Sequence, residues 1–92
     1  MKSAALSSAS CLVPAQGYRL QWEQAQQAHV LLYPEGMVTL NATAADILKR
    51  CDGRTLHALL TELQGEYPDA DLRDDVLDFM EVALEHGWLR II

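Results

Sequence analysis

Histidine and cysteine are the residues of this chain best suited to catalysis or metal binding, but their spacing favours neither. The three histidines, His29, His57 and His86, fall in different predicted elements. Neither Cys11 nor Cys51 belongs to a CxxC motif, and no HxxxH motif is present. Zinc sites are recognised in sequences by such closely spaced pairs. We therefore expect no metal site.

Carboxylates are concentrated in one segment near the C-terminus. Asp74, Asp75 and Asp78, with Glu81 and Glu85, occupy much of one side of a predicted helix. This spacing is typical of a solvated helix face rather than of a paired general acid and base. The chain also lacks a glycine-rich phosphate loop and a nucleophile elbow. We therefore predict a protein that is not an enzyme, with no catalytic residues and no cofactor, and look for an interaction surface instead.

Length and charge narrow the classes of partner. Ninety-two residues allow one domain with a modest core. Seven basic residues against 13 acidic ones, a net charge of −6, argue against a general nucleic-acid binder. No apolar run is long enough for a membrane span, and the N-terminus lacks the apolar stretch of a secretory signal, so we expect no membrane contact and a cytoplasmic location. Cys11 and Cys51 could form a bridge, but two cysteines make no disulfide framework and a reduced pair is the expectation.

The chain divides into a tail and a domain. Residues 1–17 are rich in serine and alanine and show no periodicity, which predicts a mobile N-terminal tail. Residues 18–92 form the domain, which starts with three predicted strands at 18–22, 29–33 and 37–40. Short links between consecutive strands favour an antiparallel meander with the second strand in its centre.

Capping residues mark two helices after the strands. Asn41 or Thr43 can cap the first helix, and apolar residues at helical spacing continue to Cys51. Thr55 can cap the second, which ends near Gly65.

The third helix is unusually apolar. It is expected from residue 69 or 71 to 86, with Gly87 as its stop. At 100° per residue its apolar side chains cover more than about 120° of the helix surface. They are Leu72, Val76, Leu77, Phe79, Met80, Ala83 and Leu84. Such a wide stripe indicates either a deeply embedded helix or one that contacts two partners. Residues 88–92 are expected to form a short strand or an apolar plug.

The third strand is a candidate docking edge. Met37, Val38, Thr39 and Leu40 include no charge and no proline, the devices that usually guard a sheet edge. An extended peptide could add there as a further strand. Alternatively, residues 88–92 or the N-terminal tail cover the edge. A free edge can also pair with a second copy, so the expected monomer could form a dimer.

Several short runs resemble the PqqD family, the small peptide chaperones of pyrroloquinoline quinone (PQQ) biosynthesis, from about Tyr18 to the C-terminus. The resemblance rests on the segments Leu31-Leu32-Tyr33-Pro34-Glu35-Gly36, Leu40-Asn41, Ala44-Ala45, Ile47-Leu48 and Cys51-Asp52-Gly53. It implies an α+β, winged-helix-like domain of three strands and three helices (βββααα) that belongs to the recognition elements for leader segments of ribosomally made precursor peptides.

The resemblance also implies partners and a site. The partner peptide would be the precursor PqqA, which the chaperone would present to the radical S-adenosylmethionine enzyme PqqE. The peptide would lie between the third strand and the third helix. The residues implied are Met37, Val38, Thr39 and Leu40 on one wall, and Leu72, Val76, Leu77 and Met80 on the other.

A basic cluster is a candidate contact for the enzyme. Lys49, Arg50 and Arg54 are the densest group of positive charges in the chain. They either meet PqqE or stabilise the end of the first helix, where cations complement the helix dipole. The alternative function is a winged-helix DNA-binding regulator, but its recognition helix would bring five acids to the phosphates. A quinone-handling enzyme is a third hypothesis, which turnover by the isolated chain would establish.

Overall fold

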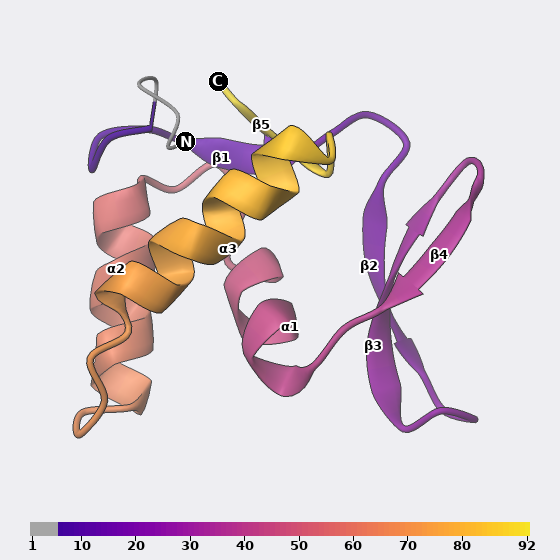
Figure 1. Cartoon of the computed structure of the whole chain (residues 1–92), viewed down its shortest axis with the longest axis horizontal. Helices are drawn as coiled ribbons and strands as arrows, with labels where there is room; N and C mark the ends of the chain where they lie inside the picture. Colours follow the sequence, from indigo (N-terminus) through magenta and orange to yellow (C-terminus); the bar gives the residue numbers. More distant parts are fainter. Residues whose placement is uncertain (1–5) are drawn as a thin grey trace.

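A three-stranded meander forms one end of the molecule. The computed structural model describes residues 6–92. Its larger sheet contains β2 (Arg19–Glu23), β3 (Ala28–Tyr33) and β4 (Gly36–Thr39) (Figure 1). Both outer strands run antiparallel to β3, and Pro34 and Glu35 alone connect β3 to β4. The predicted meander with its second strand in the centre is therefore confirmed.

Three helices follow the sheet, and the first two begin where the sequence places caps. They are α1 (Ala42–Leu48), α2 (Leu56–Glu66) and α3 (Arg73–Glu85). The side chain of Asn41 accepts a hydrogen bond from the Ala44 N–H at 2.8 Å, so Asn41 caps α1. Thr55 caps α2 by accepting from the Ala58 N–H at 3.1 Å. α3 begins two residues after the later predicted start, because residues 67–72 form a turn without a side-chain cap.

The N-terminal segment corrects one prediction. Residues 1–5 lie outside the described residues, but Leu12–Pro14 form a strand, β1, rather than part of a mobile tail. β1 pairs antiparallel with β5 (Leu89–Ile91), and Leu12 is completely buried. This pairing joins the two ends of the chain, so no local pattern around residue 12 reveals it. It also shows that residues 88–92 contain a strand, one of the two predicted outcomes.

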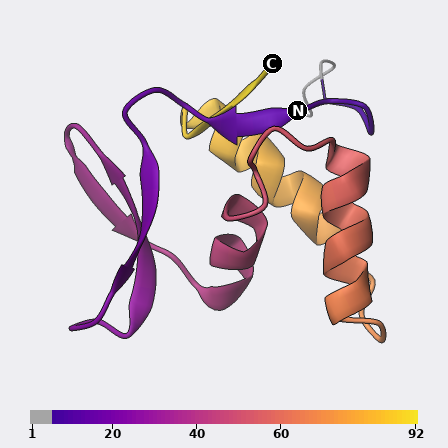
Figure 2. The ribbon, with the colours of Figure 1, turned by 180° about the vertical axis from the view of Figure 1, so that it is seen from behind.

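The core lies between the two sheets and the helices. α1 occupies the centre, with contacts to β3 on one side and to α2 on the other (Figures 1 and 2). Leu12, Ile47, Leu59 and Met80 are among its fully buried side chains. The predicted α+β order is confirmed, with the β1–β5 sheet as an addition. No helix within residues 6–92 combines the length and apolarity that crossing a membrane requires.

Candidate functional site

The outer side of β4 is an open sheet edge. The N–H of Leu40 donates to the carbonyl oxygen of His29 on β3 at 2.9 Å. Because hydrogen-bonded pairs alternate along antiparallel strands, Val38 also bonds to β3, whereas the N–H and C=O groups of Met37 and Thr39 point outward. No strand of the described residues pairs with that side. β5 pairs with β1 instead, so neither terminal segment covers β4 in the described part of the chain.

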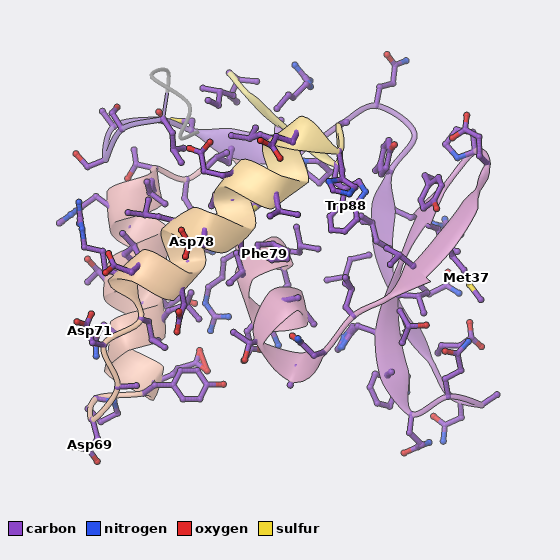
Figure 3. All side chains as sticks on the ribbon, viewed as in Figure 1. Met37, Asp69, Asp71, Asp78, Phe79 and Trp88 are labelled. Carbon is purple, nitrogen blue, oxygen red and sulfur yellow. The ribbon has the colours of Figure 1, made fainter. Side chains whose placement is uncertain are left out.

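The four side chains of this segment have different surroundings. Val38 is partly buried against the core, and Leu40 belongs to the core with 7% of its surface exposed. Met37 is 48% exposed and points away from the helices (Figure 3). Thr39 donates its hydroxyl hydrogen to Gln26 Oε1 at 3.0 Å. An added strand would therefore meet the backbone of Met37 and Thr39 and the exposed part of Val38, but not the side chain of Leu40.

The four predicted positions on α3 do not share one surface. Val76 and Met80 are core residues, exposed by 1% and 0%. Leu72 is half-buried and lines a small cavity with Val76. Arg73 of α3 lies beside the outer face of α2. Leu77 follows Arg73 by one helical turn and therefore lies on the same side of α3. Deep embedding thus accounts for Val76 and Met80, and Leu77 faces away from the sheet.

Two aromatic side chains beside α3 were not among the predicted site residues. Phe79 and Trp88 are half-buried, with ring centroids 6.4 Å apart. Figure 3 shows them on the side of α3 turned towards the sheet. Val82, three residues after Phe79, is 43% exposed. Helical spacing groups Phe79 with Val82, but only the fold shows that this side is turned towards the sheet.

Acids surround the basic cluster. Arg50 is only 8% exposed and pairs with Glu62, at 3.0 Å, and with Glu66. Its Nη1 also donates to the backbone oxygen of Asp46 at 2.8 Å. The cluster therefore joins α1 to α2. The sequence does not reveal this arrangement, because Arg50 and its acid partners are twelve or more positions apart.

The outer members of the cluster are also paired. Arg54 pairs with Glu62 and with Asp52, and its hydrogen bonds lower the pKa of Asp52 to about 2. Lys49, 49% exposed, lies 3.1 Å from Asp46. Lys49 and Arg54 thus remain reachable by a partner, while Arg50 does not.

Residues 6–92 contain no group of three histidine, cysteine or acidic side chains placed to hold a metal ion. Cys11 and Cys51 are both free thiols. Burial raises the pKa of Cys51 to about 12, so its thiol stays protonated and unreactive at neutral pH.

Comparison with known proteins gives one family. A family model described as coenzyme PQQ synthesis protein D (PqqD) matches residues 28–89. The chain is similar to a protein of Stutzerimonas stutzeri named PqqA binding protein, with 49% identity over 77 residues, which are 82% of this chain and 84% of that one. A protein of the same name from Azotobacter vinelandii is 51% identical over 77 residues, with the same coverage.

A solved structure has the same fold. It is the solution NMR structure of the PqqD truncation of Methylobacterium extorquens PqqCD, described as a functional, stand-alone recognition element for ribosomally synthesized and post-translationally modified peptides (RiPPs). The TM-score is 0.77 at 30% identity, and the match covers 98% of this chain and 99% of the other.

Proposed function

The chain belongs to the PqqD family of coenzyme PQQ synthesis proteins, and from this we propose that it binds the precursor peptide PqqA along the open edge of β4 and presents it to the enzyme PqqE. The relatives are named for binding PqqA rather than for a reaction. The protein thus acts as a peptide-binding chaperone, a RiPP recognition element.

The open edge of β4 is the observation that supports this mode of binding. The outward backbone groups of Met37 and Thr39 supply two donors and two acceptors to an added strand. Alternate side chains of that strand would face Val38, Phe79 and Trp88. A dissociation constant of about 1 μM requires only about −8 kcal/mol, within reach of a short added strand with a few buried side chains.

Presentation to PqqE requires a second surface. We propose the area around Lys49 and Arg54, which lies on the α2 side of α1 and leaves β4 free for the peptide. Binding both partners turns a second weak contact into an intramolecular one, which raises the effective concentration of the peptide at the enzyme. Arg54→Glu should weaken PqqE capture and leave PqqA affinity unchanged, because Arg54 pairs only with Asp52 and Glu62 among its ion-pair partners in the described residues. Weaker binding of both partners would place the peptide, rather than the enzyme, on this surface.

The cytoplasm is the proposed place of action, which the two free thiols favour. A DNA-binding role is disfavoured, because α3 carries five acids where a recognition helix would meet phosphates.

Titration with a PqqA peptide, followed by amide NMR, tests the docking edge. Thr39→Pro removes an outward N–H without removing a bond between β3 and β4, and we expect it to weaken binding about tenfold. Thr39→Val is the matched control, since it retains the N–H and loses only the hydroxyl bond to Gln26. A circular dichroism melt confirms that both variants fold. Equal affinity of the two folded variants, or amide shifts confined to β2, would exclude strand addition at β4.

A further inference from the structure

A small cavity lies where the three helices meet. It encloses about 80 Å³. Its lining consists of Thr43, Asp46, Ile47, Leu63, Tyr67, Leu72, Asp75 and Val76. Ile47, Leu63 and Val76 are buried, whereas Thr43 and Asp75 are exposed, so the interior is aliphatic and the mouth is polar.

We propose that this cavity receives one aliphatic side chain, flanked by a basic residue, of the peptide that binds at β4. The inference rests on the proposed function, because it extends the same peptide site along α3. The residues that line the cavity would then determine peptide specificity, and none of them belongs to the open edge of β4.

The volume of the cavity selects the kind of side chain. Apolar cavities of about 150 Å³ in proteins bind benzene, and this cavity encloses about half of that space. A valine, leucine or isoleucine side chain therefore fits, whereas a phenyl ring requires Ile47 or Leu63 to move. Because core side chains are closely packed, such a movement is costly.

Charge at the mouth selects the neighbouring residue. Asp46 accepts a hydrogen bond from the Tyr67 hydroxyl at 2.6 Å, which is the main cause of the lowered pKa of Asp46. Asp46 is therefore ionised at neutral pH, but Lys49, 3.1 Å away, offsets its charge. The exposed carboxylate of Asp75, on the same rim, supplies the negative charge that faces a bound peptide. The whole chain carries a net charge of −6. A basic residue next to the aliphatic one is attracted to this rim, and the attraction weakens as salt is added.

The cavity continues the apolar side of α3 that faces the sheet. Phe79 lies one helical turn beyond Asp75 and Val76, a rise of about 5 Å, and Val82 follows it. Thr43, on the opposite wall, is four residues after Thr39 at the end of β4. A peptide that pairs with β4 and continues beside α3 therefore passes the mouth of the cavity.

Filling the cavity is the direct test. Thr43→Ile replaces the hydroxyl group at the mouth by a larger ethyl group, and both residues are β-branched, so helix propensity changes little. Thr61→Ile is the matched control, since Thr61 is an exposed residue of α2 that does not line the cavity. We expect Thr43→Ile to weaken PqqA binding about tenfold and Thr61→Ile to change it less than twofold.

Methyl NMR and a peptide series identify the occupant. Binding of PqqA should shift the methyl signals of Ile47, Leu63 and Val76 and leave that of Leu89, in the other sheet, in place. Each aliphatic residue of PqqA is then replaced by alanine in turn. One replacement should weaken binding to the wild type about tenfold but scarcely affect binding to the Thr43→Ile variant, because the two changes remove the same contact.

The outcomes separate this inference from the proposed function. If PqqA shifts the amides of Met37 and Thr39 while the cavity methyl signals stay in place, the pocket assignment is wrong and peptide binding at β4 stands. If PqqA does not bind at all, the proposed function fails and the pocket assignment fails with it. Preference for a phenylalanine over a leucine at the identified peptide position would also overturn the inference.

Discussion

Replacing Arg50 by methionine should loosen the junction between α1 and α2. Arg50 follows α1 directly, and its guanidinium contacts two acids of α2, Glu62 and Glu66, together with the backbone oxygen of Asp46. Methionine keeps an unbranched side chain of similar reach, so most apolar contacts of the arginine stem survive. The substitution therefore removes the three polar contacts and leaves the packing largely intact.

The expected loss is about 2 kcal/mol. The two acids are 50% and 46% exposed, so both stay hydrated when Arg50 is absent, and each ion pair contributes about 0.5–1 kcal/mol rather than the several kcal/mol of a fully buried pair. The hydrogen bond to Asp46 adds about 1 kcal/mol, because the donor is charged and 8% exposed. Glu62 and Glu66, four residues apart on α2, also repel each other once the shared cation is gone. For a domain of this size, the melting temperature should fall by roughly 10 °C.

Urea unfolding followed by circular dichroism measures this loss. Arg54→Met is the matched control, because the pairs of Arg54 with Asp52 and Glu62 lie at the surface; we expect a clearly smaller loss of stability than for Arg50→Met. A double-mutant cycle between Arg50→Met and Glu66→Gln should give a coupling of about 0.5–1 kcal/mol.

An unchanged unfolding midpoint for Arg50→Met would refute this reasoning. It would mean that the free-energy cost of removing the guanidinium from water equals the stabilisation from its three contacts, as in some buried ion pairs. A wild-type midpoint together with weak PqqE capture would instead assign Arg50 to the enzyme contact.

Three further predictions concern β1, α3 and the junction of the helices. Leu12→Ala should lower the free energy of unfolding, measured in urea, by about 2–4 kcal/mol, because Leu12 is fully buried. A loss below about 1 kcal/mol would indicate that this segment is a mobile tail after all. Phe79→Ala should weaken PqqA binding about tenfold in a titration of the folded variant, and unchanged affinity would remove α3 from the peptide site. Tyr67→Phe should reduce the loss of stability below about pH 4. The Tyr67 hydrogen bond lowers the pKa of Asp46 from its ordinary value of 3.8, so its stabilisation is complete above that pH and is lost as the pH falls through the lower, folded-state pKa. A pH series of melting temperatures with an equally steep acid limb in both proteins would contradict that assignment.

Much of the fold follows from short-range signals. Asn41 and Thr55 cap their helices through N–H groups only three residues away, so the sequence around each cap contains both partners. The meander also follows from local information, because Pro34 and Glu35 join neighbouring strands by the shortest connection. The absence of charge and proline from residues 37–40 marked a candidate docking edge but left open whether a terminal segment covers it; β4 is open among the described residues.

The candidate site was only partly predictable. The sequence singled out β4 and α3, but it could not show which side of α3 is turned towards the sheet. A stripe of apolar side chains looks the same whether it faces a core or a ligand, so Val76 and Met80 could not be distinguished from Phe79 before the fold was known.

The sequence by itself determined the number and order of the central elements, the lack of charge on β4 and the family to which the chain belongs. Tertiary structure alone decided the pairing of β1 with β5, the acid partners of Arg50, the orientation of α3 and the cavity among the helices. The physical reason is sequence distance. Caps and tight turns are made within a few residues, whereas these four features join residues from a dozen to nearly eighty positions apart, and a contact of that range leaves no periodic trace in either of its partners.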